Sequence, residues 1–185
     1  MNLWFRLFWY LLNSWRRPTL VLPAQSSVLA FHVLPTDLDL SLHMNNGRYL
    51  TIMDLGRVDL MLGSGLLKLL LQHGWTPIAS GINIRYRREL RLFDQFTLET
   101  RLVSWTDVTV VMEQLFVFKG GTRDGQVAAR AFVKAGLYDR KAKAFVTIAK
   151  LLGLLGTTAE SPPVPADVEA FLKADEALRA GSGLS

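Results

Sequence analysis

Cysteine is absent from this chain of 185 residues, and histidine is scarce, with three residues in all. The missing cysteines exclude a disulfide framework, a Cys-ligated zinc or iron–sulfur site, and a thiol nucleophile. A disordered chain is excluded as well, because half of the residues are apolar and only a fifth are charged. A chain of this length typically forms one domain with short appendages and can bury a core of its own.

A long basic run is also lacking, although the formal net charge is +5 and 21 residues are Lys or Arg. Nucleic-acid binders gather such residues in a run or along one helix face. Here they are spread along the chain, and the only dense group is Arg85, Arg87, Arg88 and Arg91. We therefore expect no nucleic-acid partner. The positive charge suits an acidic lipid surface or a phosphorylated small molecule instead.

Residues 1–17 lack a hydrophobic run that could cross a bilayer as a helix, since residues 3–12 form a short stretch interrupted by Arg6. They also lack the basic start and the cleavage site of a signal peptide. Three of the five tryptophans lie here, and aromatic rings followed by Arg16 and Arg17 are typical of a segment at the lipid headgroups. The segment is either such an interfacial anchor or a helix packed on the domain or on a partner, and we favour the anchor. We expect a cytoplasmic protein, peripheral at a membrane if the anchor holds.

Apolar periodicity and turn residues predict the secondary structure. Residues 48–74 are predicted as one long central helix that bends at residues 63–65. This helix is apolar on more than one side, so we expect protein all round it. Strands are predicted over residues 26–34, 75–88, 96–102, 108–118 and 126–139. Two shorter helices are predicted over residues 147–155 and 167–181, the second with Val168, Phe171, Leu172 and Leu178 on its packed side.

This order of elements predicts an α+β fold in which an antiparallel β-sheet wraps round one long central helix. We divide the chain into the hydrophobic segment 1–17, a single domain over 26–156, and a linker with an amphipathic helix over 157–185. One central helix leaves the edges and the outer face of the sheet exposed. Self-association is therefore expected, as a homodimer or a dimer of dimers.

The segment that carries chemistry is the loop 37–49, with the sequence DLDLSLHMNNGRY. It places two carboxylates, an imidazole and two carboxamides directly before the predicted helix; these belong to Asp37, Asp39, His43, Asn45 and Asn46. The first N–H groups of a helix can stabilise an oxyanion as it develops. Gly47 has no Cβ, so a substrate carbonyl could approach the backbone closely there.

The same loop resembles the motif of the 4-hydroxybenzoyl-CoA thioesterase-like family of the hotdog superfamily, roughly D-x-D-x-x-G-H-V-N-N-x-x-Y before an apolar helix with an arginine. The matching residues are Asp37, Asp39, His43, Asn45, Asn46, Tyr49 and Arg57. The likeness extends from Ser27 to Thr147, and its wording is most similar to the thioesterase-superfamily member 6 subgroup. It implies a single hotdog domain and an enzyme that hydrolyses acyl-CoA.

The resemblance implies that Asp39 is the catalytic carboxylate, either as general base on water or as nucleophile on the thioester carbonyl. The N–H groups around Asn46 and Gly47 would polarise that carbonyl, and His43 is a further catalytic candidate. No cofactor is implied beyond the coenzyme A of the substrate. The family has a glycine where this chain has Leu42, a difference expected to alter the loop backbone and the entry of substrate.

Each of these residues also has a purely structural interpretation. Asp39 could hold the loop through its own backbone, and Asp37 suits that role better than catalysis. His43 could organise the loop, and Asn45 and Asn46 suit turn and N-cap positions. No metal site is expected, because a further strong ligand near Asp37, Asp39 and His43 is missing.

Substrate-binding candidates come from two sources. Asn45, Tyr49 and Arg57 follow from the family motif. Arg85 and Arg87 alternate with apolar residues in a predicted strand, and arginine suits the phosphates of coenzyme A. Outward arginines on an amphipathic strand can equally form a solvated face.

Two functions of different classes remain. The first is an enzyme that hydrolyses a medium- or long-chain acyl-CoA. The second is a non-catalytic acyl- or lipid-binding protein at a membrane surface, suggested by Leu42 and by the aromatic N-terminus. Apolar residues of the central helix, such as Leu55 and Val58, would line an acyl channel or fill the core.

Overall fold

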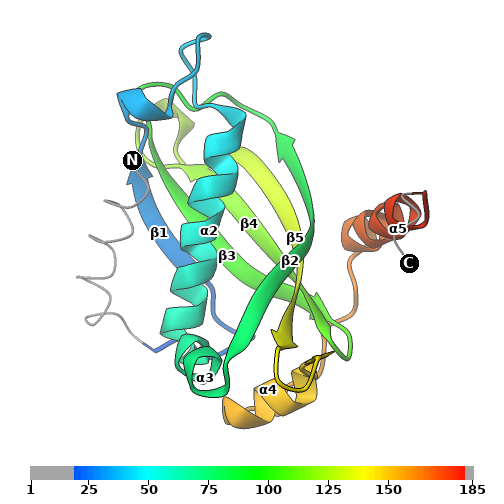
Figure 1. Ribbon diagram of the computed structural model, residues 1–185. Coiled ribbons are helices and arrows are strands. Elements are labelled where there is room, and N and C mark those ends of the chain that lie inside the picture. The colour runs from blue at the N-terminus through cyan, green and yellow to red at the C-terminus, as the bar shows by residue number, and fades with distance from the viewer. Residues whose placement is uncertain (1–18, 182–185) are drawn as a thin grey trace.

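A computed structural model describes residues 19–181, in which a curled antiparallel β-sheet surrounds a long helix, α2 (Figure 1). This confirms the expected α+β hotdog architecture. The helices are α2 (Asn46–Gly63), α3 (Leu66–His73), α4 (Ile148–Leu154) and α5 (Ala166–Gly181). The strands are β1 (Ser27–His32), β2 (Trp75–Tyr86), β3 (Gln95–Trp105), β4 (Thr109–Phe118), β5 (Val127–Asp139) and β6 (Ala144–Phe145).

The strands follow the order β1-β3-β4-β5-β2, with β6 added beside β5, and every pairing is antiparallel. The strands β1 and β2 are therefore the two edges. Alternate residues of each strand face α2, as Phe96 and Leu98 do from β3 and Phe116 does from β4. These three side chains are completely buried, and they form the centre of the core with Met53 of α2.

Helix α2 begins at an N-cap and ends where its backbone turns. The side chain of Asn45 caps the first turn, and Ser64 and Gly65 separate α2 from α3, with Gly65 at a φ of +77°. The bend expected at residues 63–65 is confirmed as a break between two helices. Gly56 lies where α2 touches the sheet, and a Cβ there would stand 2.5 Å from Thr100 Oγ1. Glycine is thus what allows the helix to sit so close to β3.

Helix α5 covers part of the outer face of the sheet, on the opposite side from α2 (Figure 1). Its residues Val168 and Phe171 pack on Val111 and Phe132 of the sheet, as their spacing predicts. The prediction for Leu178 was wrong, because this side chain is 75% exposed near the end of the helix. The sheet reaches α5 only along its first turns, so the last turn has nothing to pack on. No helix among residues 19–181 is long and apolar enough to cross a membrane.

Candidate functional site

The loop before α2 is a tight hairpin that projects beyond the end of the helix (Figure 1). Leu38 and Met44 form an isolated antiparallel bridge, and the Asp39 N–H donates to the His43 carbonyl oxygen at 3.0 Å. The Leu42 N–H donates to the Asp39 carbonyl oxygen at 3.1 Å. The hairpin therefore turns within residues 39–43 and brings both ends of its motif together.

Leu42 lies at this turn with a φ of +60°, in the left-handed region that glycine adopts without penalty. Its side chain is 72% exposed and does not pack in the core. The effect of Leu42 on the loop backbone and on substrate entry, relative to a glycine there, stays a prediction. The chain adopts a conformation that suits glycine and carries leucine in it, at an intrinsic cost of about 1–2 kcal/mol.

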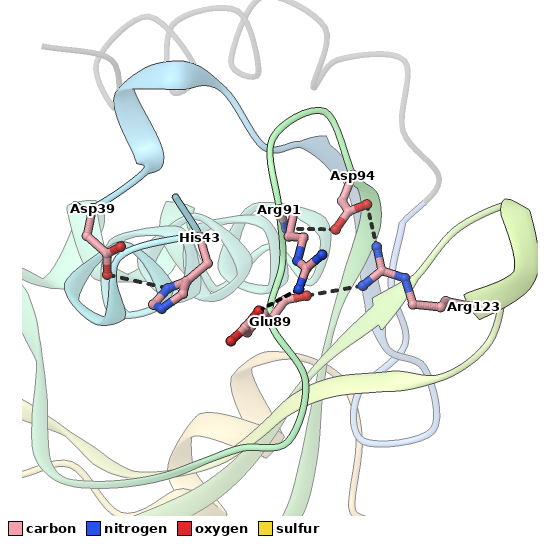
Figure 2. Close-up of polar contacts among 6 residues, drawn as sticks. All are labelled: Asp39, His43, Glu89, Arg91, Asp94 and Arg123. Carbon is pink, nitrogen blue, oxygen red and sulfur yellow. Dashed lines mark hydrogen bonds and ion pairs between the residues drawn. The ribbon is translucent and has the colours of Figure 1, made fainter. Parts of the chain in front are cut away.

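The carboxylate of Asp39 is directed at His43 across this hairpin (Figure 2). Asp39 Oδ2 lies 3.4 Å from His43 Nδ1, and Asp39 Oδ1 accepts a hydrogen bond from the Ser41 N–H at 2.9 Å. Both side chains are about a quarter exposed, at 27% and 28%. An aspartate and a histidine so placed can orient each other and can share or transfer a proton.

The N-terminus of α2 offers one free N–H group beside this pair. Asn45 Oδ1 accepts from the Gly47 N–H at 2.8 Å, and the Asn45 carbonyl oxygen accepts from the Arg48 N–H at 2.8 Å. Within residues 19–181 no acceptor is bonded to the Asn46 N–H. Of the two backbone donors expected from the sequence, Gly47 is thus engaged by the cap and Asn46 is available to a ligand.

These groups border an open hollow of about 240 Å³, which we call the site hollow. Its lining residues are His43, Met44, Asn46, Tyr49, Tyr86, Arg87, Arg88 and Glu89. The end of β2 forms one wall, and the Tyr86 hydroxyl donates to the Asn46 carbonyl oxygen at 3.3 Å. Asp39 does not line the hollow and stands behind His43.

Asp37 and Tyr49 support the site from the core side. Asp37 is 1% exposed, accepts from the Leu34 N–H at 2.9 Å and lies 3.5 Å from the Arg48 guanidinium. Tyr49 packs its ring against Tyr86 and Phe116, each at 4.9 Å between centroids. Burial raises the pKa of Tyr49 to about 12, so its hydroxyl stays protonated at neutral pH.

The arginine group of the sequence divides into residues with different surroundings. Arg91 lies in a turn where its N–H donates to Asp94 at 2.7 Å and its side chain pairs with Glu89 at 3.2 Å (Figure 2). Arg87 lines the site hollow, whereas Arg85 stands beside Arg130 on the outer face of the sheet. Neither Arg85 nor Arg87 makes a side-chain bond to another described residue.

Sequence reasoning missed Met44, Tyr86 and Glu89 among the lining residues of the site hollow, and it noted Arg88 only as a member of the dense arginine group. Tyr86, Arg88 and Glu89 lie about forty residues beyond the loop motif, and the pairing of β2 with β5 brings this segment to the start of α2. The sequence feature that could have pointed to Tyr86, Arg88 and Glu89 is the end of the alternating segment 75–88, where the strand leaves the sheet.

Arg57 lies away from the site hollow, eleven residues after Asn46 and thus about 16 Å along the helix. Its guanidinium donates to Gln114 Oε1 at 3.0 Å and pairs with Asp54. Burial lowers the pKa of Arg57, and the negative charge of Asp54 opposes that shift. Arg57 borders a second, larger cavity of about 370 Å³ between α2 and the sheet.

Comparison with protein families matches residues 33–172 to the Thioesterase-like superfamily. The chain belongs to this superfamily. Protein THEM6 of Xenopus laevis is 36% identical over 158 residues, which cover 83% of this chain and 72% of that protein. The long-chain acyl-CoA thioesterase FadM of Escherichia coli (strain K12) is 29% identical over 104 residues, or 56% of this chain and 76% of that protein.

Solved structures of the superfamily share the fold. The probable thioesterase YbaW from Escherichia coli has a TM-score of 0.64 at 25% identity, covering 70% of this chain and 95% of that one. A Staphylococcus aureus protein in complex with CoA has a TM-score of 0.63 over 78% of this chain and 94% of its own; at 16% identity, this likeness shows the fold alone. Membership of the superfamily places the chain among the thioester hydrolases.

Proposed function

We propose that this protein hydrolyses a fatty acyl-CoA, or a related acyl thioester, to the free acid and the thiol. The observation that carries the proposal is the free Asn46 N–H at the start of α2, beside the Asp39–His43 pair and open to the site hollow. A thioester carbonyl in the hollow can accept from this N–H, with the positive end of the helix dipole behind it. The relative FadM is named a long-chain acyl-CoA thioesterase, which supports the same substrate class.

In the general-base route, Asp39 takes a proton from water as the water oxygen bonds to the carbonyl carbon. The electron pair of the C=O bond moves onto oxygen, where the Asn46 N–H stabilises it. The pair then returns, the C–S bond breaks, and the thiolate leaves with the proton that Asp39 took, so that free acid, thiol and the Asp39 carboxylate result.

In the nucleophilic route, the Asp39 side chain turns past His43 into the hollow and attacks the carbonyl carbon. The C–S bond breaks, the thiolate leaves, and water hydrolyses the mixed anhydride to the free acid and the Asp39 carboxylate, its released proton passing to the thiolate. Because His43 stands between Asp39 and the hollow, it can orient the carboxylate or relay the proton.

The arginines at the end of β2 suit the phosphates of coenzyme A. Arg87 lines the site hollow without a side-chain partner among the described residues, so its charge is available to a ligand. Arg88 also lines the hollow, and it donates to the Val127 carbonyl oxygen at 3.1 Å. Arg85 would bind only a phosphate that extends round the strand edge. Asn45 and Tyr49 would act by shaping the helix start, and Arg57 by bordering the larger cavity.

We also propose that the protein acts as a homodimer joined along β2. This twelve-residue edge strand carries Ile78 and Ile82, which are 38% and 42% exposed. Exposed apolar edge strands readily pair with a second strand. Antiparallel pairing of two copies would lay the start of one β2 beside the end of the other, and so beside its site hollow.

The membrane anchor of residues 1–17 lies outside the described residues and stays a proposal. The full chain is expected to co-sediment with anionic vesicles, and a chain lacking these residues is not. Equal sedimentation of the two would contradict the anchor.

The alternative function is a non-catalytic acyl-binding protein, and the larger apolar cavity favours it as much as it favours an enzyme. A thiol-release assay on the purified full chain with acyl-CoAs of increasing length separates the two. Saturable release of coenzyme A is expected. Tight binding of the same compounds without thiol release would establish the alternative and overturn the hydrolase.

A further inference from the structure

Two neighbouring loops, the hairpin before α2 and the turn between β2 and β3, carry large apolar side chains at their tips. Four of these side chains, which we call the apolar tips, are each at least 40% exposed: Leu40, Leu42, Leu92 and Phe93. His43 and Arg91 form an antiparallel bridge, and the Met44 N–H donates to the Leu90 carbonyl oxygen at 2.8 Å. The two loops therefore lie side by side, at the end of the molecule where the hairpin projects (Figure 1).

Two of the apolar tips occupy backbone positions that suit glycine. Leu42 has a φ of +60° and Phe93 a φ of +65°, and within residues 19–181 Lys143 is the only other non-glycine residue at positive φ. This conformation is unfavourable for bulky residues. Packing in the core does not compensate for it, since the two side chains are 72% and 67% exposed. Residues held in unfavourable conformations cluster at binding sites, where a ligand or partner contacts them.

The turn that carries Phe93 is held in place by polar contacts (Figure 2). The Arg91 N–H donates to the Asp94 carboxylate at 2.7 Å, and the Arg123 guanidinium pairs with the same carboxylate at 2.6 Å. Arg123 also donates to the Glu89 carbonyl oxygen at 3.2 Å. A loop fixed in this way loses little conformational entropy when its side chains bind.

The charge around the apolar tips is positive. Each carboxylate on the two loops faces a basic side chain: Asp39 faces His43, Glu89 faces Arg91, and Asp94 faces Arg123. By contrast, Arg87, Arg88 and Lys119 are exposed and form no ion pair with another described residue. Lys119 lies beside the turn, because its N–H donates to the Gln95 carbonyl oxygen at 2.9 Å. This excess of positive charge suits an anionic partner.

The shape of the apolar tips fits a lipid surface better than a protein. A stable protein interface buries about 800 Å² on each partner. Four side chains would each have to contribute about 200 Å², which is the whole area of a large aromatic residue. A bilayer instead accepts separate apolar side chains among its headgroups, and its anionic lipids attract neighbouring basic residues.

We propose that the apolar tips insert into the headgroup layer of an anionic lipid bilayer, with Arg87, Arg88 and Lys119 against its phosphates. The site hollow lies beside the hairpin, since His43 lines it, so the hollow opens at the lipid surface in this arrangement. The contact is separate from the anchor proposed for residues 1–17. It goes beyond the proposed function, because it holds whether or not the protein releases thiol.

The chain contains no cysteine, so Leu40→Cys supplies a single thiol for an environment-sensitive fluorophore. The labelled full chain is mixed with vesicles of equal parts phosphatidylcholine and phosphatidylserine. Its emission should shift to shorter wavelength, because the label leaves water. Ala170→Cys on the exposed side of α5 is the control, and its emission should not shift. An unshifted label at Leu40 would overturn the inference even if residues 1–17 bring the chain to the vesicles.

A second measurement removes two of the apolar tips. Asparagine tolerates positive φ and suits turns, so the double variant Leu40→Asn, Phe93→Asn should remain folded, as thermal unfolding would show. Its affinity for the same vesicles should fall by at least about tenfold, because burial of one large apolar side chain contributes roughly that factor. Leu178→Asn, at a side chain that is 75% exposed on α5, is the matched control and should bind as wild type does.

Equal vesicle binding by the double variant and Leu178→Asn would overturn the inference. A double variant that binds vesicles as wild type does, but loses self-association in sedimentation velocity, would assign the apolar tips to a contact between copies and would also overturn it. Thiol release measured without lipid should be the same in the double variant and wild type. Weakened vesicle binding in a protein that releases no thiol would support this inference and contradict the proposed hydrolysis.

Discussion

At the scale of single residues, the hairpin before α2 combines a motif of local contacts with one unusual backbone conformation. Leu42 at a φ of +60° is held there by the Leu38–Met44 bridge and by the contact of its neighbour His43 with Arg91. The hairpin is thus determined by hydrogen bonds on both sides of Leu42. Its side chain contributes little, since it is exposed.

We expect Leu42→Gly to keep activity and to leave the free energy of unfolding unchanged or raised by up to about 1 kcal/mol, because relief of strain outweighs the entropy of an added glycine. The β-branched Leu42→Val should destabilise, since valine tolerates positive φ poorly. Urea unfolding of both variants checks this. A lower stability for Leu42→Gly than for Leu42→Val would contradict the assigned backbone conformation.

The residues that the sequence could identify in the site are those that lie together along the chain. Asp39, His43 and Asn46 fall within one loop, so their meeting at the helix start follows from local structure. Tyr86 and Glu89 could not be found in this way, because their place depends on how β2 pairs with β5. The sequence also could not tell that Asn45 engages Gly47 and leaves Asn46 free, since that depends on one side-chain rotamer.

At the scale of elements, apolar periodicity predicted strands such as β2 and β3 and the helix α5, which have a distinct inner face, whereas α2 was recognised from its length and its apolar residues on more than one side. Turn residues located most of the ends, and Gly63–Gly65 located the break between α2 and α3. The prediction that Leu178 packs was wrong, because helical spacing defines one side of α5 but does not show where the sheet beneath the helix ends. The sequence also could not predict the larger cavity between α2 and the sheet. Val58 lines this cavity, whereas Leu55, three residues earlier, packs on β1.

The contact of α2 with the sheet gives a test at this scale. Gly56→Ala would place a Cβ 2.5 Å from Thr100 Oγ1 and 2.7 Å from Leu98 Cδ2, in a region with no free space. Overpacking of this kind costs about 1–3 kcal/mol. Gly153→Ala in α4 meets nothing within 4 Å and should be neutral or slightly stabilising. Thermal unfolding of the two variants should therefore differ in sign, and equal stability would contradict the close approach at Gly56.

At the scale of the whole molecule, the sheet that wraps round α2 has two edge strands, β1 and β2. Of these two described strands, β2 is the one that lines both the site hollow and the larger cavity between α2 and the sheet. Composition and element order predicted exposed sheet edges but could not tell which edge strand is better suited to pair with a second copy. The strand order and the exposed side chains of Ile78 and Ile82 favour β2. Helix α5 covers part of the outer face, and the β2 edge is the surface that we propose for a second copy.

The dimer predicts that Ile82→Lys, near the middle of β2, brings two like charges together across the symmetry axis and gives a monomer with at least tenfold lower activity. Val28 is also exposed and lies on the other edge strand, β1, so the Val28→Lys protein should remain a dimer. Sedimentation velocity distinguishes the two states. A monomeric wild type, or a dimeric Ile82→Lys, would exclude the β2 interface.

The central claim is that the Asp39 carboxylate acts on a thioester held at the start of α2, and thiol release from a long-chain acyl-CoA tests it most directly. Asp39→Asn keeps the shape and removes the charge, so folding should be unchanged and turnover should fall by at least about tenfold, as for the loss of a general base. Glu176→Gln on the exposed side of α5 is the control and should match wild type. Undiminished thiol release by a folded Asp39→Asn protein would contradict the account.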